Sequence, residues 1–226
     1  MAQLVVHHLE NSRSQRLLWL LEELELEYEI RRYERSEAGR APPELRTVHP
    51  LGKSPVLTNG EIVVAESGAI TEYVVEELAG GRMRPPAGTD ALRRYRFFLH
   101  FAEGSMMAPL LVKLIFARVR AAVPLLGKAI AKKVDATFTD REIRIHLAFV
   151  EAELEGRDWL AGDELSAADV MMSYPLQAAT SRGGLAGEHP GILAYLSRIE
   201  ARPAYQRALE RGGPFDVAGL RSGKAR

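Results

Sequence analysis

Hydrophobic positions in the first eighty residues follow two different periods, which predicts strands and helices in alternation. Leu4–Val6 is a short apolar run rich in β-branched residues, as in a buried strand. Residues 16–24 place their leucines on one face of a helix. In Tyr28–Tyr33, apolar and charged side chains alternate as they do in a half-buried strand. These three elements predict a β-α-β unit.

Proline and glycine mark the elements that follow. Segment 41–51 carries three prolines and is expected to be irregular. Two short apolar runs, 55–58 and 61–64, flank Asn59-Gly60, which predicts a hairpin closed by a type I′ turn. Helical spacing returns over 67–78, and two glycines at 80 and 81 end that helix.

The rest of the chain is predicted to be helical after a linker rich in glycine and proline. Long periodic segments cover about 90–120 and 125–155, and Pro124 separates them. Ser166 and Asp169 have the spacing of a capping box, in which Ser166 caps free N–H groups and Asp169 reaches back to the N–H of Ser166. Pro190 and Pro203 fit the first turns of two further helices. We expect an α/β domain over 1–80, a linker over 81–89, an all-helical domain over 90–211 and a flexible basic tail over 212–226.

Composition narrows the chemistry. Hydrophobic residues make up 46% of the 226 positions, enough for a sizeable core. The 30 Lys and Arg balance the 30 Asp and Glu, so there is no basic excess to indicate nucleic acid or a membrane surface as a partner. The absence of cysteine excludes disulfides, thiolate zinc sites and a cysteine nucleophile.

The remaining sequence signals favour a soluble, metal-free protein. No secretory signal is recognisable, and the apolar stretches are expected to be too short to span a bilayer, so we expect a cytoplasmic protein. The six histidines have no metal-ligand spacing beyond the adjacent His7 and His8, which should point to opposite faces of a strand. We therefore expect no metal.

Four segments, in this order and on these elements, resemble the glutathione S-transferases. They are residues 11–16 with the Leu-Leu-Trp-Leu-Leu-Glu-Glu-Leu that follows, residues 52–57, residues 66–70 and the capping box at 166–169. Arg202-Pro203-Ala204 is also similar, and the resemblance covers about residues 3–211. It implies a thioredoxin-like N-terminal domain followed by an all-α bundle, with glutathione as co-substrate. It also implies an enzyme that activates the glutathione thiol for addition to an electrophile.

Ser12 is the first candidate for the group that activates the thiol. The thiolate is the nucleophile, and a free thiol has a pKa of about 8.5. Lowering that pKa by about two units needs about 2.7 kcal/mol, and one hydrogen bond to a charged group supplies roughly 1.5–3 kcal/mol. Ser12 lies where the first strand ends and the first helix begins. The alternative is that Ser12 or Ser14 only caps the helix. Counting back from Arg16, as in many transferase classes, makes Asn11 the second candidate.

The resemblance also implies which residues bind glutathione. Ser54–Pro55 is expected to be a cis peptide bond that exposes the backbone of Ser54 to the cysteinyl amide, and Lys53 would reach the glycine carboxylate. Glu66 and Ser67 open the third helix, where they would bind the ammonium and the γ-glutamyl carboxylate. The alternatives are an ordinary proline that opens a strand, a solvated lysine and a serine that only caps a helix.

The second substrate is expected to be a small apolar electrophile in a pocket between the domains. Its candidate wall residues, each of which could instead belong to the core, are Met106, Met107, Leu110, Phe116 and Tyr174. The resemblance further implies a homodimer and a role in detoxification. Two other functions stay open: a glutathione-dependent isomerase of the maleylacetoacetate type or a disulfide or peroxide reductase, and a non-catalytic ligand-binding or protein-interaction module.

Overall fold

The chain forms two compact units in the computed structural model, which describes residues 3–36, 39–182, 189–213 and 215. The first unit comprises Met1–Thr89 together with Arg198–Arg226, and the second comprises Asp90–Ser197. A four-stranded mixed sheet with helices lies in the first unit, and the second unit is helical. The predicted fold class is therefore confirmed. The domain boundaries expected from the sequence stay a prediction.

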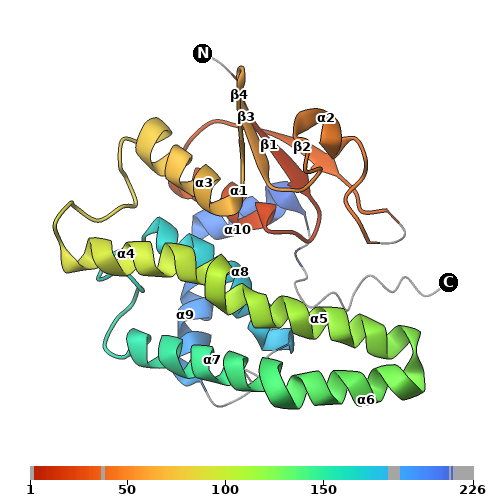
Figure 1. Cartoon of the computed structure of the whole chain (residues 1–226). Helices are drawn as coiled ribbons and strands as arrows, with labels where there is room; N and C mark the ends of the chain where they lie inside the picture. Colours follow the sequence, from red (N-terminus) through yellow and green to blue (C-terminus); the bar gives the residue numbers. More distant parts are fainter. Residues whose placement is uncertain (1–2, 37–38, 183–188, 214, 216–226) are drawn as a thin grey trace. The chain divides into compact units, whose positions relative to one another are not determined.

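The sheet of the first unit contains a parallel pair and two antiparallel pairs. Its strands are β1 (Leu4–Leu9), β2 (Glu29–Tyr33), β3 (Val56–Asn59) and β4 (Ile62–Ala65), arranged in the order β2-β1-β3-β4 (Figure 1). Strand β1 runs parallel to β2 and antiparallel to β3, and β3 runs antiparallel to β4. The parallel pair with the helix between its strands confirms the β-α-β unit.

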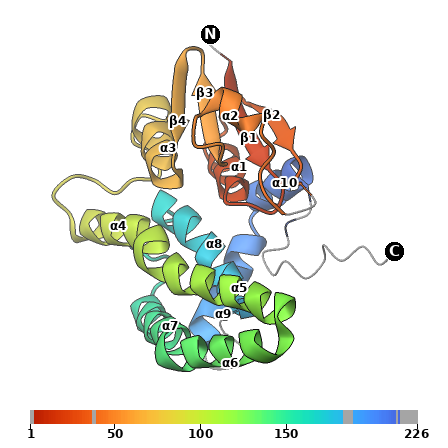
Figure 2. The same ribbon diagram turned by 45° about the vertical axis from the view of Figure 1, so that its right-hand side comes forward.

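Helices cover this sheet and hold its strands in place. They are α1 (Ser14–Glu23), the single turn α2 (Leu45–Val48), α3 (Ser67–Tyr73), the π-helical turn η1 (Val74–Leu78) and α10 (Pro203–Gly212). The leucines of α1 are buried. Helix α10 lies beside α1 in Figures 1 and 2, and Gln15 of α1 donates to the carbonyl of Ala208 on α10 at 2.8 Å. Arg207 and Arg211 each bond to Glu22 at 2.8 Å. Burial opposes ionisation of Glu22, but hydrogen bonds from Arg207, Tyr28 and Arg211 outweigh it and lower the pKa.

Two local predictions in the first unit need correction. The proline-rich segment is not wholly irregular, because one turn of helix, α2, forms inside it. In the hairpin, Asn59 pairs with Ile62, so the two loop residues are Gly60 and Glu61 rather than Asn59 and Gly60. Of these two, only Gly60 has positive φ, at 62°. That pattern matches a type II′ turn, which requires positive φ at its first central residue alone.

In the described residues of the second unit, the regular elements are all helices. They are α4 (Asp90–Phe101), the π-helical turn η2 (Ala102–Met106), α5 (Met107–Ala122), α6 (Pro124–Val134), the π-helical turn η3 (Asp135–Thr139), α7 (Asp140–Leu154), α8 (Ala167–Arg182) and α9 (Pro190–Glu200), whose last residues belong to the first unit. Helices α5 and α6 lie side by side (Figure 2). Four phenylalanines stack between α4 and α7 at centroid distances of 5.1–6.3 Å, namely Phe97, Phe98, Phe101 and Phe149.

One sequence expectation on membrane spans is not met. The uninterrupted helical run Asp90–Ala122 has 33 residues, and by length and composition alone it could cross a bilayer. The buried core helix of a soluble protein meets the same criterion, and Met106 and Leu110 of this run are fully buried. Small and polar residues interrupt the apolar positions in the middle of the run, so the sequence contains no unbroken apolar stretch long enough to indicate a membrane span.

The start of α8 is closed by a buried carboxylate. Asp169 is fully buried and accepts the N–H of Ser166 at 2.8 Å, which confirms the predicted reach-back. The hydroxyl of Ser166 also donates to Asp169 at 2.8 Å. Leu160 N–H and the Tyr195 hydroxyl complete the set at 2.9 and 3.0 Å. Burial raises the pKa of Asp169, and these four hydrogen bonds oppose that shift.

The end of the chain is only partly described. Helices α9 and α10 begin at Pro190 and Pro203, as predicted. Gly212, expected at the start of a flexible tail, is instead buried, and its carbonyl accepts hydrogen bonds from His8 and Arg32. Most of the predicted tail, residues 214 and 216–226, lies outside the described residues.

Candidate functional site

The sequence-predicted residues of the first unit lie at one edge of the sheet, the edge formed by the C-terminal ends of β1 and β4 and the N-terminal end of β3. His7 of β1 pairs with Val56 of β3, and Val56 pairs with Ala65 of β4, so these three residues form one row across the sheet. The chain leaves β1, enters β3 and leaves β4 just beyond this row. The segments at this edge therefore carry the candidates Asn11, Ser12, Lys53, Ser54, Pro55, Glu66 and Ser67.

Ser54 is fastened to the end of β1. Its hydroxyl donates to the carbonyl of His7 at 2.9 Å and accepts the N–H of Leu9 at 3.2 Å. The Ser54–Pro55 peptide bond is cis, as predicted, and Pro55 is buried. Because the hydroxyl proton of Ser54 is donated to β1, the donor that this residue can offer a ligand is its backbone N–H. This is the kind of contact that the sequence resemblance implies.

Asn11 adopts an uncommon backbone conformation in the turn that precedes α1. Its φ is 47°, in the left-handed region that asparagine tolerates better than most residues. Arg35, which follows β2, donates to the carbonyl of Asn11 at 3.0 Å and to the carbonyl of Glu10 at 3.2 Å. The guanidinium thus stabilises the turn that leads from β1 to Ser12.

Ser12 lies two residues before α1 and is 6% exposed. Its hydroxyl is 2.7 Å from the hydroxyl of Ser14 and accepts the N–H of Ser14 at 3.2 Å. The structure assigns Arg13 as the N-cap residue of α1, and Arg13 makes no side-chain capping bond. Ser12 therefore does part of what a cap does, by binding one free N–H, and its oxygen also touches a second hydroxyl.

A buried histidine stands behind these two serines. The Nδ1 atom of His8 is 2.8 Å from the hydroxyl of Ser14, and its Nε2 atom is 3.0 Å from the carbonyl of Gly212. Burial lowers the pKa of His8 to about 4, a shift that the bond to Gly212 opposes and the charge of Arg32 reinforces. His8 is therefore neutral at neutral pH.

The start of α3 presents two candidate groups at the same sheet edge. Glu66 has a φ of 73° and an exposed side chain that makes no capping bond. Ser67 is buried, and its carbonyl accepts the hydroxyl of Thr71 at 2.8 Å inside the helix. Lys53 is exposed. The side chains of Glu66 and Lys53 are accordingly available to charged groups that approach this edge from solvent, whereas Ser67 lies beneath the surface.

His7 and His8 point to opposite faces of β1, as the alternation of a strand requires. The Nδ1 and Nε2 atoms of His7 are 2.9 and 3.3 Å from the hydroxyls of Tyr33 and Thr58. Burial, together with the charge of Arg31, lowers the pKa of His7. Among the residues that the structure describes, no group of three or more histidine or acidic side chains could hold a metal ion.

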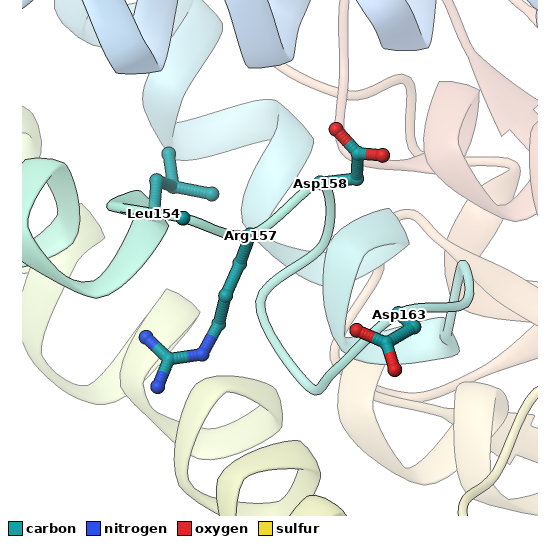
Figure 3. A pocket seen from close by; sticks show the side chains of 5 residues that line it. Leu154, Arg157, Asp158 and Asp163 are labelled. Atoms are coloured by element: carbon teal, nitrogen blue, oxygen red, sulfur yellow. The ribbon is translucent and has the colours of Figure 1, made fainter.

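The candidate wall residues of the electrophile pocket all belong to the second unit. Met106, Met107 and Leu110 are buried around the join of η2 and α5, as is Tyr174 on α8. Phe116 is half-buried. A separate cleft of about 380 Å³ follows α7, and Figure 3 shows Leu154, Arg157, Asp158 and Asp163 around it. It contains none of the sequence-predicted residues.

His8, Ser14 and Gly212 are the residues of this site whose contacts the sequence did not reveal. Period-two alternation along β1 places His8 on the face opposite His7, but it does not say what lies there. Its partner Gly212 is 204 positions away in the chain. A signal was nevertheless present in the hydroxyl pair Ser12 and Ser14, which has one member more than a single helix cap needs.

Two family models match the chain and together cover most of it. The model described as the glutathione S-transferase N-terminal domain matches residues 2–76. The model described as the glutathione S-transferase C-terminal domain matches residues 114–203. The sheet edge, α1 and α3 all lie within the first match, and α7 and α8 lie within the second.

Similar proteins bear the same family name. Glutathione S-transferase 1 of Saccharomyces cerevisiae is 35% identical over 219 residues, which cover 91% of this chain and 94% of that protein. The crystal structure of a glutathione S-transferase from Actinobacillus pleuropneumoniae is 34% identical, with a TM-score of 0.82 and 96% of both chains covered. A theta class glutathione S-transferase from Xanthomonas axonopodis pv. citri, solved with glutathione bound, shares the fold at 23% identity. Its TM-score is 0.72, with 92% of this chain and 97% of that chain covered.

Proposed function

Because the chain belongs to the glutathione S-transferase family, we propose that Ser12 activates the glutathione thiol in the first unit. The chain is a glutathione transferase, with glutathione as its co-substrate. The residues that carry this activity are our assignment. Ser12 donates a hydrogen bond to the thiolate, and Asn11 is the second candidate for that role.

The observation that carries the proposal is the gathering of complementary groups at one sheet edge. The register of β1, β3 and β4 brings their ends together there. Glutathione has two carboxylates, one ammonium, two amides and a thiol. Lys53 suits the glycine carboxylate, the backbone of Ser54 suits the cysteinyl amide, and Glu66 suits the ammonium. The Ser67 hydroxyl at the start of the helical run 67–78 suits the γ-glutamyl carboxylate.

The reaction needs only the thiolate and an electrophile. The sulfur electron pair forms a bond to the electrophilic carbon, and the electrons displaced from that carbon leave with a leaving group or take up a proton from solvent. Ser12 favours the thiolate because a hydroxyl that donates to a charged sulfur lowers the pKa of the thiol. Stabilisation of roughly 1.5–3 kcal/mol corresponds to a pKa about one to two units lower.

We assign the apolar electrophile to the second unit, near the join of η2 and α5. Met106, Met107 and Leu110 are buried there, with Tyr174 on α8, so they form a firm apolar layer. Phe116 is half-buried further along α5 and has more freedom to meet a ligand. Among these five, Phe116 should therefore affect the choice of electrophile most directly.

We also propose a homodimer that works in the cytoplasm in detoxification. Strand β4 and helix α3 of the first unit enclose a hollow of about 540 Å³ lined by Ile62, Val64 and Tyr73, among others. Ile62 and Val63 are exposed. Exposed apolar side chains on the outermost strand of a sheet suit a self-complementary interface. Light scattering should give about twice the chain mass of 25.0 kDa at micromolar concentration.

Calorimetric titration with glutathione tests the assignment of the binding groups. Glu66→Gln and Lys53→Ala should each weaken binding severalfold, because each removes one charge partner of the tripeptide. Glu61→Gln, in the turn between β3 and β4, and Lys132→Ala, in the second unit, alter exposed side chains and serve as matched controls. Equal affinity in all four variants would contradict the assignment.

A conjugation assay then tests the role of Ser12. Ser12→Ala should bind glutathione about as well as the unchanged protein but conjugate an electrophile more slowly at neutral pH. The rate should recover in part as the pH rises, because the thiol then ionises unaided. An unchanged rate at pH 6.5 would remove Ser12 from the mechanism.

A further inference from the structure

A line of three hydrogen bonds connects the hydroxyl of Ser12, through Ser14 and His8, to the carbonyl of Gly212 at the end of α10. The distances along it are 2.7 Å from Ser12 Oγ to Ser14 Oγ, 2.8 Å from Ser14 Oγ to His8 Nδ1 and 3.0 Å from His8 Nε2 to the carbonyl oxygen of Gly212. All four residues are buried within the first unit. Each hydroxyl has a single proton, so the direction of one bond determines the direction of the next.

The direction of the line is set at its Gly212 end. A carbonyl oxygen can only accept, so Nε2 of His8 carries the proton that is donated to Gly212. The neutral imidazole then has no proton on Nδ1, and Nδ1 must accept from Ser14. Since Ser14 has spent its only proton on His8, the hydroxyl of Ser12 must be the donor in the contact between the two serines.

A second acceptor competes with His8 for the proton of Ser14, and the same argument decides between the two. The hydroxyl of Ser14 also lies 3.2 Å from the carbonyl of Leu9. A proton donated to Leu9 would leave Nδ1 of His8 buried without a donor, which costs more than the longer bond returns. The proton of Ser14 therefore belongs to His8.

The geometry points to His8 as a positioning residue that, through Ser14, turns the Ser12 hydroxyl proton inward, away from the place where the thiol would bind. This inference rests on the proposed role of Ser12. With the proton turned inward, Ser12 offers an incoming thiol an acceptor lone pair rather than a proton. Donation to the thiolate requires Ser12 to break its bond with Ser14, so the line makes the thiolate less stable than Ser12 alone would make it.

The contacts of Gly212 at the end of α10 maintain the direction of these hydrogen bonds. The Gly212 carbonyl is among the last of the helix, where no intrahelical N–H remains to bind it. His8 and Arg32 supply the missing donors, each at 3.0 Å. A side chain at position 212 would meet Gln15 at 2.3 Å and Leu18 at 2.7 Å, so both of these side chains would have to shift to admit one.

Burial, more than the charged groups around it, keeps His8 neutral. Arg32 on β2 lowers the pKa of His8, and Glu10 after β1 raises it by a smaller amount. From α1 the facing group is the hydroxyl of Ser14, and from α10 it is the carbonyl of Gly212. Burial dominates these influences, so the imidazole keeps one proton, on Nε2, at the pH where transferases are assayed.

The thiolate absorbance of bound glutathione, followed against pH, tests this inference. In Ser14→Ala, Ser12 has no inner partner to leave, so the pKa of the bound thiol should fall by about 0.5–1 unit. His8→Leu removes the acceptor, so Ser14 can donate to Ser12 and Ser12 to sulfur; the Leu9 carbonyl at 3.2 Å competes for the Ser14 proton, so the shift should have the same sign but be smaller than in Ser14→Ala. His8→Gln retains one acceptor and one donor and should behave as the unchanged protein does.

A double variant separates this inference from the function beneath it. If the effect of Ser14→Ala acts through Ser12, it should vanish when Ser12 is already alanine. If Ser12→Ala leaves the thiol pKa unchanged, the proposed role of Ser12 fails. If Ser12→Ala raises that pKa but Ser14→Ala leaves it unchanged or raises it, only the inference about His8 fails. Should His8→Leu not fold, Ser14→Ala and His8→Gln decide the question.

Discussion

Both α1 and α8 are preceded by a buried serine, Ser12 and Ser166, and the two helix starts use it in different ways. At α8, the N–H and the hydroxyl of Ser166 both donate to one carboxylate, that of the buried Asp169. At α1, the hydroxyl of Ser12 meets a second hydroxyl, that of Ser14, and then an imidazole. In the α8 network, every donor meets one group that only accepts. The α1 network passes through groups that can both donate and accept before it ends at the carbonyl of Gly212.

The difference teaches what separates a structural cap from a candidate chemical group. An ionised carboxylate has no proton to give, so every bond around Asp169 has one possible direction. The serine pair at α1 has two possible directions, and the choice depends on His8. A serine of the first kind is inert, whereas a serine of the second kind can give its proton to another acceptor once it gives up one hydrogen bond.

Breaking the α8 network should produce the largest effect on stability. Asp169→Ala removes one acceptor from four donors, three of which come from Ser166 and Tyr195. Leaving several buried donors without a partner should lower the free energy of unfolding by about 4 kcal/mol. Denaturant unfolding followed by circular dichroism measures this loss.

The matched control is Asp169→Asn, which keeps the shape and one acceptor oxygen but replaces the other with a donor. It should cost less than the alanine variant. A free energy of unfolding within about 0.5 kcal/mol of the unchanged protein in Asp169→Ala would mean that the network does not hold the start of α8.

The α1 network should make stability depend on pH, which is the second largest effect. The pKa of His8 is about 4 in the folded chain, against 6.5 for an unperturbed histidine. The unfolded chain therefore binds the proton more tightly, and stability rises with pH between about 4 and 6.5. Relative to His8→Gln, the chain should lose up to about 3 kcal/mol as the pH falls from 7 to 4.

This difference isolates His8 from the other histidines. His7 and His146 also have lowered pKa values, and they contribute equally to both proteins. The measurement is the free energy of unfolding at several pH values for the pair of proteins. Parallel stability curves over this pH range would show that the imidazole is not held neutral by the fold.

The smallest expected effect sharpens the contrast between the two serines. Ser166→Ala loses one hydrogen bond to Asp169 while the backbone N–H of residue 166 keeps its own, so it should cost about 1 kcal/mol. The thiol pKa of bound glutathione should not move in this variant. If Ser166→Ala did shift that pKa, the distinction between an inert and a chemical serine would be wrong.

Local patterns were enough to predict the elements and the fold class. Alternation along β1 separates His7 from His8, the leucines of α1 give its buried face, and Pro190 and Pro203 mark two helix starts. These features depend on neighbours in the chain, so a short window contains the relevant information. The Ser166 and Asp169 pair is of the same kind.

Features that depend on tertiary contacts could not be predicted from the sequence. The bond from His8 to Gly212 and those from Arg207 and Arg211 to Glu22 join residues about 185–204 positions apart. The hairpin turn depends on the pairing of Asn59 with Ile62, and a shift of one residue changes which positions need positive φ. The assignments of Ser12, Asn11 and the electrophile walls stay predictions, because they concern bound ligands.

The thiol pKa of bound glutathione in Ser12→Ala and Asn11→Ala tests the central claim most directly. Thiolate absorbance is followed against pH in each saturated complex. Our account predicts a pKa about one to two units higher in Ser12→Ala and a smaller shift in Asn11→Ala, since one lost bond to a charged sulfur is worth roughly 1.5–3 kcal/mol. A raised pKa in Asn11→Ala with none in Ser12→Ala would give the role to Asn11. An unchanged pKa in both variants would contradict the claim that a side chain at this sheet edge stabilises the thiolate.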